Sequence, residues 1–344
     1  MTNSSQFFDE MAGQPEALRR LAAYYEGPEG AARLAGLPAT PPALLLGMGA
    51  SHHSGLFAAH ELRQHGLVVP ALEATEALYV ETQALKQARR VVYVSQSGAS
   101  GEVLPLLERL GAGAHVTAIT NDDHSQLAQL AQAVLPVLAG QEETVATKTL
   151  TNSLALLWLL IQHWTKGQDK NDYARLRRVA DRLEQTLEQA PALADLWLTE
   201  LGDARTYVMI GTGVQAITAR HTAMILMEWL KTPALSASVG AFRHGPIEIT
   251  QPGLGVVVFV APGPAYASSC QLAGTLKDYG ARVLLVEQGH SRRQAEPAVD
   301  GHIVEGALSA ILDSLPIQIF AEALARQKGL LTGFRHIEKV VTLF

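Results

Sequence analysis

The stretch Val91-Val92-Tyr93-Val94-Ser95-Gln96-Ser97-Gly98 changes from a β-branched apolar run to a polar turn. The apolar run predicts a strand, and a helical pattern follows at Gly101–Leu110. In an open α/β sheet, ligands bind at the carboxyl ends of the strands. Hydroxyl and backbone N–H groups at the start of a helix suit a phosphate. We therefore expect this turn to hold a small phosphorylated ligand.

An ordinary strand-to-helix turn, with a serine as N-cap, is the alternative to a ligand site at this position. Ser51 favours the ligand site, because it follows the first predicted strand and would reach the same edge of the sheet. A helix cap alone does not need hydroxyl groups from two strand ends.

Short apolar runs alternate with segments of helical periodicity along the whole chain. In the first half, strands are predicted at Leu44–Leu46, Val68–Leu72, Val91–Val94, Val116–Thr120 and Val134–Val137. In the second half, strands are predicted at Tyr207–Ile210, Leu235–Ser238, Val256–Val260, Val283–Val286 and Ile303–Val304. The longer helices are predicted at Thr149–Trp164, Asn171–Gln189 and Ser309–Lys328. This alternation predicts an α/β fold with parallel sheets between helical layers.

The two halves repeat each other in the same order. Gly47-x-Gly49 follows the first strand of one half, and Gly211-x-Gly213 follows the first strand of the other. The offset grows from 164 residues between Gly47 and Gly211 to 168 residues between Val134 and His302. A period of this length indicates two copies of one domain. We expect a helical leader and the first lobe over 1–190, and the second lobe with a C-terminal tail over 191–344.

The copies differ at the polar turn. Where the first copy has Ser95 to Ser100, the second has Val260-Ala261-Pro262-Gly263-Pro264. Because this second turn offers no comparable hydroxyls, we expect only the first copy to have kept the phosphate site.

Composition limits the class of protein. The 344 residues are 48% hydrophobic, which suffices for two domains of roughly 150–200 residues each. The net charge of −6 argues against a nucleic-acid partner. Cys270 is a single thiol and cannot form an internal disulfide. The polar start of the chain shows no signal peptide, and the apolar stretch Leu154–Ile161 is too short to span a membrane. We expect a cytoplasmic protein without membrane contact.

One pattern weakly suggests a cofactor, and the histidines do not suggest a metal. Gly47-Met48-Gly49-Ala50-Ser51-His52 resembles a dinucleotide fingerprint, but its sixth position needs a small residue and carries His52. Glu73, near the end of the next predicted strand, keeps this alternative open. The histidines show no spacing of metal ligands. We expect neither a metal nor a cofactor.

Two residues of the second half could transfer protons. Glu228 lies near the end of a helix predicted from about Gln215, and His244 lies in a loop bounded by Gly245-Pro246. A surface glutamate and a loop histidine without function remain the alternative.

Five segments together carry a resemblance to a known family. They are Gly49-Ala50-Ser51, Ser95-Gln96-Ser97-Gly98, Val145-Ala146-Thr147-Lys148, Gly211 through His244-Gly245-Pro246, and the tail to Lys339-Val340-Val341-Thr342. In this order and spacing they resemble the sugar isomerase (SIS) family in its tandem form. The likeness is to the isomerase half of glucosamine-6-phosphate synthase and to stand-alone glucosamine-6-phosphate deaminases. It implies two tandem SIS-type lobes with parallel-sheet αβα sandwich architecture.

The resemblance also implies roles for individual residues. A sugar phosphate would be held by Ser51, Ser95, Gln96, Ser97 and Ser100, with Val145 lining the sugar site. Glu228 would move a proton between C1 and C2, and Lys339 would meet the carbonyl end of the sugar. His244 would open the ring from the neighbouring subunit, which implies a homodimer.

Departures from the family pattern leave the substrate open. The synthase begins with a glutaminase domain and an N-terminal cysteine nucleophile, whereas Thr2 follows Met1 here. We therefore expect a chain that releases ammonia instead of taking it from glutamine. Other departures are Ala99 after the turn, His221 and Ile225 in the catalytic helix, Ala241-Phe242-Arg243 before His244, and a segment before Thr147 that is one residue short.

These residues predict a phosphosugar aminoisomerase or deaminase, with glucosamine 6-phosphate as the first candidate substrate and fructose 6-phosphate plus ammonia as products. A phosphosugar aldose–ketose isomerase, a deglycase, and a non-catalytic phosphosugar sensor are the alternatives.

Overall fold

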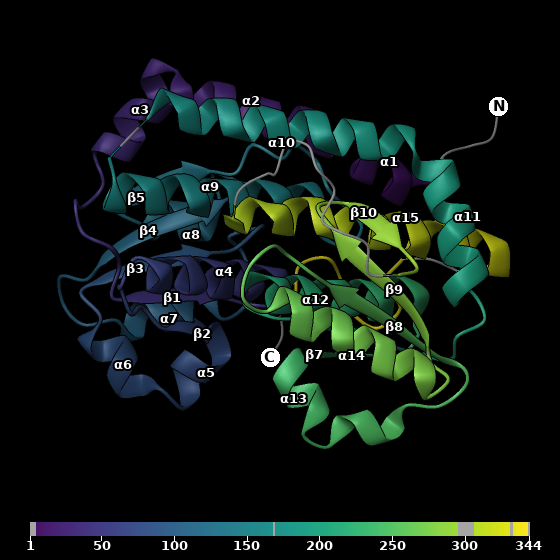
Figure 1. The fold of residues 1–344 in the computed structure, drawn as a ribbon. Coiled ribbons are helices and arrows are strands. Elements are labelled where there is room, and N and C mark those ends of the chain that lie inside the picture. Colours follow the sequence, from purple (N-terminus) through teal and green to yellow (C-terminus); the bar gives the residue numbers. More distant parts are fainter. Residues whose placement is uncertain (1–4, 168, 295–305, 331–332, 343–344) are drawn as a thin grey trace. The chain divides into compact units, whose positions relative to one another are not determined.

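The computed structural model describes residues 5–167, 169–294, 306–330 and 333–342 (Figure 1). The chain forms two compact units. The first-copy unit consists of Gly13–Ala180 and Arg335–Phe344, and the second-copy unit consists of Met1–Ala12 and Asp181–Phe334. The division falls at 180/181 instead of the expected 190/191, within helix α10 (Lys170–Glu188). The N-terminal segment therefore belongs to the second-copy unit, and the C-terminal segment belongs to the first-copy unit.

The first-copy unit contains a five-stranded parallel sheet in the order β2-β1-β3-β4-β5. Its strands are β1 (Leu44–Gly47), β2 (Ala71–Glu73), β3 (Arg90–Val94), β4 (His115–Thr120) and β5 (Ala133–Pro136). The central strands are buried on both faces, as the continuous apolar runs in the sequence predict.

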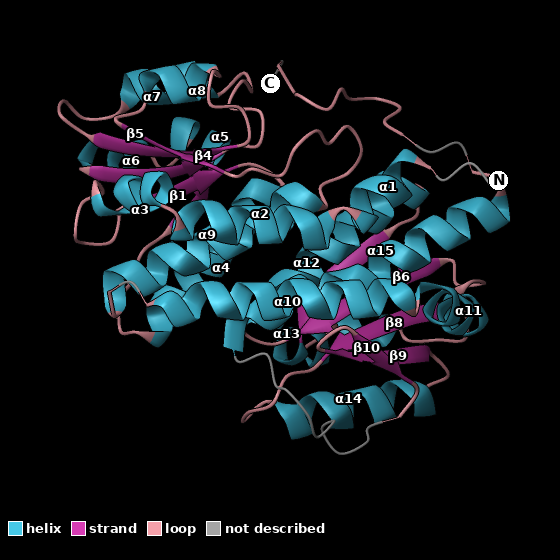
Figure 2. Cartoon of the chain, turned by 90° about the horizontal axis from the view of Figure 1, so that it is seen from above, coloured by secondary structure: helices cyan, strands magenta, loops and turns pink. Residues whose placement is uncertain are grey.

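Helices cover both faces of this sheet (Figures 1 and 2). The helices of this unit are α2 (Gln14–Glu26), α3 (Pro28–Ala35), α4 (Ala50–Gln64), α5 (Ala74–Tyr79), α6 (Thr82–Gln87), α7 (Val103–Arg109), α8 (Gln126–Leu130), α9 (Lys148–Thr165) and the first part of α10. Side chains of α5 to α8 pack with one sheet face into a core that includes Leu46, Leu78, Tyr93 and Leu106.

The second-copy unit repeats this topology. Its strands are β6 (Thr206–Gly211), β7 (Ala234–Ser238), β8 (Leu254–Phe259), β9 (Arg282–Glu287) and β10 (His290–Arg292). Their order, β7-β6-β8-β9-β10, matches the first sheet strand for strand. Strand β10 differs because it runs antiparallel to β9. The strand predicted at Ile303–Val304 lies outside the described residues.

The helical elements of this unit are α1 (Gln6–Ala12), α11 (Ala190–Leu201), α12 (Val214–Ile225), the π-helix η1 (Leu226–Leu230), α13 (Val239–Arg243), the 3₁₀-helices η2 (Pro246–Ile249) and η3 (Gly306–Leu308), α14 (Tyr266–Asp278) and α15 (Ser309–Lys328). The stretch Gly306–Lys328 is long and apolar enough to cross a membrane. Its most apolar window is 94% buried within the protein, so α15 has the surroundings of a core helix.

The paired glycines confirm the internal duplication at the level of the backbone. Gly49 has φ 51° and ψ −124°, and Gly213 has φ 65° and ψ −130°. A Cβ on Gly47 would lie 2.6 Å from backbone of Ser51, and one on Gly211 would lie 2.3 Å from backbone of Gln215. Both copies therefore use the same strand-to-helix turn, which only glycine permits.

Two predicted boundaries were wrong, and a proline explains each. Strand β2 begins at Ala71, directly after Pro70, and not at Val68. Helix α7 begins at Val103 and not at Gly101. A start at Gly101 would put Pro105 where its backbone N–H should bond within the helix, whereas a start at Val103 keeps it in the first turn.

Candidate functional site

The predicted phosphate turn lies where the strand order of the first sheet reverses. Strand β1 has β2 on one side and β3 on the other. The connections from β1 to β2 and from β2 to β3 therefore run in opposite directions across the sheet, and the crevice between β1 and β3 is a topological switch point. Ser51, in the first turn of α4, follows β1. Ser95 to Ser100 follow β3. Both predicted hydroxyl groups therefore lie at the edge where open α/β sheets bind ligands.

The turn is held in shape by its own serine hydroxyls. Ser95 Oγ accepts a hydrogen bond from the Gly98 N–H at 3.1 Å and lies 3.4 Å from Ser100 Oγ. The Ala99 N–H donates to Ser97 Oγ at 3.2 Å. A hydroxyl that accepts a hydrogen bond keeps its own hydrogen for another acceptor. Ser97, and whichever of Ser95 and Ser100 accepts from the other, can therefore donate to phosphate oxygens.

Gly98 fixes the path of the turn. It has a positive φ of 58°, and a Cβ at this position would lie 2.1 Å from Ser125 Oγ. Its carbonyl accepts from the Leu127 N–H at 2.9 Å, and the carbonyl of Gln96 accepts from the Asn121 N–H at 3.0 Å. The turn is thus bound through the Gln96 carbonyl to the loop after β4 and through the Gly98 carbonyl to α8.

The helix after the turn is shorter than predicted and contributes less to a phosphate site than expected. Helix α7 has seven residues, and the Gly101 N–H donates to the Val341 carbonyl of the C-terminal tail at 3.1 Å. A dipole from two helical turns is small, because it grows with the number of aligned peptide units. The case for phosphate at this edge therefore depends on the serine hydroxyls and on the turn.

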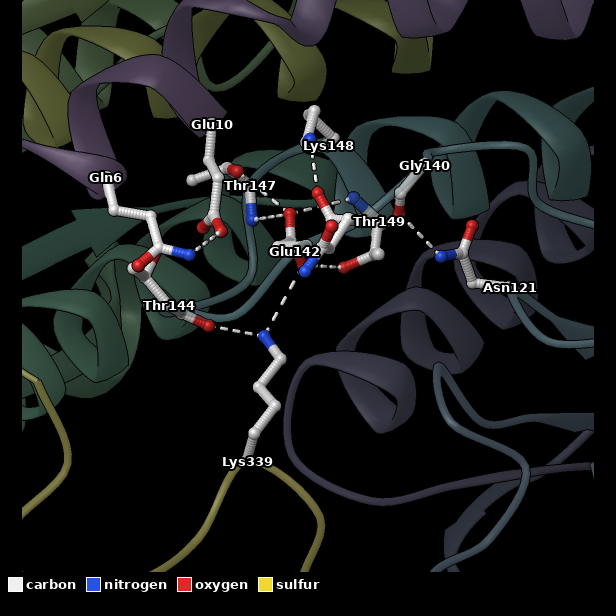
Figure 3. A network of polar contacts seen from close by, with 11 residues as sticks. Gln6, Glu10, Asn121, Gly140, Glu142, Thr144, Thr147, Lys148, Thr149 and Lys339 are labelled. Carbon is white, nitrogen blue, oxygen red and sulfur yellow. Dashed lines mark hydrogen bonds and ion pairs between the residues drawn. The ribbon is translucent and has the colours of Figure 1, made fainter.

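The tail brings Lys339 to the loop before α9 (Figure 3). Lys339 Nζ donates to the Thr144 carbonyl and lies 3.5 Å from Glu142 Oε2. Val145, the next residue of this loop, is buried. The first-copy unit thus contains six residues predicted for the phosphate and sugar together with Lys339. Those six are Ser51, Ser95, Gln96, Ser97, Ser100 and Val145.

Glu142 is a residue of this site that sequence reasoning missed. Its carboxylate accepts from the backbone N–H and hydroxyl of both Thr147 and Thr149. In the sequence, Glu142 is only an acidic residue shortly before a long helix. Acidic residues at such positions are also common without any functional role. Its partner Lys339 is 197 residues away in the chain.

Glu228 lies in a segment of unusual helix geometry. Helix α12 changes to a π-helix over Leu226–Leu230, and Lys231 then takes a left-handed conformation with φ 55°. Single turns of π-helix are rare and occur often at functional sites. The neighbouring Trp229 is buried, with its ring centroid 4.4 Å from that of Phe7. Glu228 is half-buried at this distorted helix end.

His244 lies at the exposed end of α13. Buried Phe242 anchors this helix, and Gly245 continues the chain with a φ of 124°. Glu228 precedes strand β7 and His244 follows it, so the two residues flank opposite ends of a five-residue strand. Such a strand spans roughly 16 Å.

His52, the residue that weakens the dinucleotide alternative, is buried in the first turn of α4. Its Nδ1 lies 3.4 Å from Glu73 Oε1 at the end of β2. In a dinucleotide site this acidic residue would bind a ribose hydroxyl. Here it pairs with the imidazole instead.

Comparison with known proteins identifies the domain. Residues 42–162 match the SIS domain family. This part of the chain is a SIS domain. It contains the serine turn, Ser51, Val145 and Glu142. The resemblance inferred from the five segments is thereby confirmed.

The relatives and solved structures extend the likeness beyond the SIS domain. The glutamine–fructose-6-phosphate aminotransferase (isomerizing) of Thermococcus kodakarensis is 29% identical over 297 residues, which cover 83% of this chain and 49% of that protein. The chain thus spans about half the length of the relatives it matches.

Two solved structures share the fold over nearly the whole chain. A glucosamine-6-phosphate deaminase from Thermotoga maritima has a TM-score of 0.81 and 21% identity, covering 98% of this chain and 100% of that one. A tagatose-6-phosphate ketose/aldose isomerase from Escherichia coli has a TM-score of 0.78 and 22% identity, covering 96% of each chain. At these identities the likeness shows the fold, and the predicted α/β class with two five-stranded sheets is confirmed.

The position equivalent to Ser51 of the SIS domain is filled differently in the second copy. Gln215, 164 residues later, donates from Nε2 to Ser309 Oγ at 3.0 Å and to Asp313 Oδ2 at 2.9 Å. Asp313 Oδ1 accepts from the Gly289 N–H at 2.8 Å. Gln215 thus donates to two buried side chains of its own unit, where Ser51 of the first copy has a short hydroxyl.

We expect Asp313 to make the free energy of unfolding depend on pH. Burial raises the pKa of its carboxyl from 3.8 to about 7. Between these values the folded protein binds more protons than the unfolded chain, so the free energy of unfolding should fall as pH rises from about 4 to about 7. Asp313→Asn should remove this contribution to the slope, which is about 1.4 kcal/mol per pH unit for one proton. Denaturant unfolding of both proteins across this pH range measures the difference. Parallel pH curves would contradict the prediction.

Proposed function

We propose that this chain is a phosphosugar aminoisomerase or deaminase that converts glucosamine 6-phosphate to fructose 6-phosphate and ammonia. One observation carries the proposal. A serine-rich turn lies at the switch point of a SIS domain, and Lys339 docks within the same unit beside Val145. A phosphate group and a reactive carbonyl are the two ends of an open-chain hexose phosphate, and these two features suit them.

In this proposal the turn binds and orients the substrate. The hydroxyls of Ser51, Ser95, Ser97 and Ser100 and the Gln96 side chain would donate to the phosphate oxygens. Hydrogen bonds to an anion are stronger than those between neutral groups, so several such donors can anchor a small ligand. Val145 would line the sugar.

The proposed chemistry is a proton transfer followed by hydrolysis. His244 would assist ring opening to the aldehyde, acting from the neighbouring subunit of a homodimer. Glu228 would take the proton from C2 and return it to C1, which converts the 2-amino aldehyde to a 2-imine. Water then replaces the nitrogen at C2 and releases ammonia. Lys339 would stabilise the charge that develops on the oxygen at C1.

A panel of phosphorylated sugars tests this function. The purified protein is incubated with glucosamine 6-phosphate and related aminosugar phosphates, and ammonia and ketose phosphate are measured together. We expect equal amounts of both products from at least one aminosugar phosphate. Failure to release ammonia from any of them would refute the deaminase proposal.

An aldose–ketose isomerase is the second candidate. Two residues of helix α12, which precedes Glu228, favour it. His221 and Ile225 stand where the synthase resembled by this chain has Glu and Lys, and both side chains are buried. The same proton transfer without an amino group would interconvert an aldose phosphate and a ketose phosphate. Ketose formation from a neutral hexose phosphate, without ammonia, would establish this alternative.

The remaining alternatives give other outcomes in the same panel. Cleavage of a phosphorylated amine–sugar adduct would indicate a deglycase. Thermal stabilisation by hexose phosphates without any turnover would indicate a phosphosugar sensor. We propose a cytoplasmic location, in keeping with the free thiol of Cys270 and a small phosphorylated metabolite as ligand.

A further inference from the structure

We propose that Glu142 is a positioning residue, which holds Lys339 and with it the C-terminal tail against the SIS domain. The docking of the tail follows from the contacts of the first-copy unit alone. The consequence for catalysis rests on the proposed function, because it assumes that Lys339 acts on the sugar.

The side chain of Glu142 is fully buried and is held by several hydrogen bonds. None of its side chain is exposed. Oε1 accepts from the Thr147 N–H at 2.9 Å, the Thr147 hydroxyl at 2.8 Å and the Thr149 N–H at 3.2 Å, and Oε2 accepts from the Thr149 hydroxyl. The carboxylate also lies at the amino end of the 18-residue helix α9, where the helix dipole favours negative charge. Both oxygens are therefore held in place before Lys339 arrives.

Lys339 completes the set of donors around this carboxylate (Figure 3). Its Nζ lies 3.5 Å from Oε2 and donates to the Thr144 carbonyl, and 24% of its side chain remains exposed. An ammonium group between a carboxylate and a carbonyl is held in direction as well as in position. Because threonine donors already engage both oxygens of Glu142, we assign it a positioning role and not that of a proton acceptor.

A second contact fixes the tail two residues later. The Val341 carbonyl accepts from the Gly101 N–H, which follows the serine turn. Lys339 and Val341 thus connect the tail to the loop before α9 and to the segment after β3. Removing the Lys339 contact should leave the tail with the weaker of these two attachments, since the Val341 contact joins neutral groups.

Glu142→Gln tests the assignment with little change in size. A carboxamide keeps one acceptor oxygen, but it places an NH₂ donor where Oε2 or Oε1 accepted. The variant should therefore lose its hold on Lys339. The matched control is Glu143→Gln, which removes the same charge from the exposed neighbouring residue.

Competitive acetylation of lysines, followed by mass spectrometry, measures how strongly the contact with Glu142 protects Lys339. In the unmodified protein and in Glu143→Gln, Lys339 should react about tenfold more slowly than exposed Lys170. In Glu142→Gln, Lys339 should react as fast as Lys170. Slow acetylation of Lys339 that persists in Glu142→Gln would overturn the proposal.

A second variant covers the case in which Glu142→Gln folds poorly. Lys339→Ala leaves the buried contacts of Glu142 with Thr147 and Thr149 intact, so it should fold normally. Tryptic cleavage after Arg335 should become about tenfold faster in Lys339→Ala, because the tail is released more often. A cleavage rate equal to that of the unmodified protein would contradict the proposal.

Turnover separates this proposal from the proposed function. If the protein releases ammonia, Glu142→Gln should lower kcat/KM about tenfold or more while the affinity for the phosphosugar changes little. Unchanged kcat/KM with Lys339 freed would overturn the positioning role and leave the proposed function standing. If the unmodified protein turns over no aminosugar phosphate, the proposed function fails. Acetylation still decides whether Glu142 holds Lys339, and cleavage still decides whether Lys339 holds the tail.

Discussion

Glu228→Gln should lower the turnover of glucosamine 6-phosphate by roughly 10²–10⁴-fold, the usual contribution of a general acid–base group. Glutamine has nearly the same shape as glutamate but cannot take a proton from C2. The phosphate contacts proposed here come from residues of the first-copy unit, which this substitution does not alter. Affinity for the substrate should therefore change little. Steady-state kinetics with ammonia detection and calorimetric titration measure the two quantities.

Glu188→Gln is the matched control, because it removes the same charge from an exposed residue of α10 in the same unit. It should leave kcat unchanged. If Glu228→Gln kept more than about a tenth of the turnover, Glu228 would not be the group that moves the proton.

Gly98→Ala should abolish most of the affinity for sugar phosphates. The added Cβ would lie 2.1 Å from Ser125 Oγ, and alanine is strained at a φ of 58°. The turn must therefore shift and carry its serine hydroxyls with it. A loss of about 2–3 kcal/mol in binding free energy, which is roughly 30-fold to 150-fold in Kd, is expected. Calorimetric titration with glucosamine 6-phosphate gives this value directly.

Gly263→Ala provides the control in the second copy. Gly263 also has a positive φ, 140°, and lies in the turn that replaces the serine turn, but nothing lies within 4 Å of an added Cβ. Gly263→Ala should therefore strain the backbone of the second copy but leave the affinity for sugar phosphates unchanged. Equal losses of affinity in both variants would mean that Gly98→Ala acts through general destabilisation.

Much of the fold could be predicted because each signal is local. The strands at the centre of both sheets are continuous apolar runs, and the final helix Ser309–Lys328 has the predicted bounds. The two Gly-x-Gly turns also revealed the duplication, because close backbone contacts allow no other residue there. Strand β10 was missed, since its hairpin turn at Gln288-Gly289 lacks the common Asn-Gly signal, although both residues have positive φ.

The candidate site could be predicted only in part. The serine turn was found because a strand, a turn and a helix start follow one another in the chain. Glu142 was missed because its role depends on a contact with Lys339, 197 residues later, which local patterns do not contain. The resemblance to the SIS family supplied Lys339, and the structure then showed its carboxylate partner.

Calorimetric titration of the unmodified protein with glucosamine 6-phosphate and with glucosamine tests most directly whether the serine turn holds a sugar phosphate. We predict one site per chain, with the phosphorylated sugar bound at least about 100-fold more tightly, since several charge-assisted hydrogen bonds depend on the phosphate. Gly98→Ala should lose this preference and Gly263→Ala should keep it. Equal affinity for the two sugars, or a preference that survives in Gly98→Ala, would contradict this assignment.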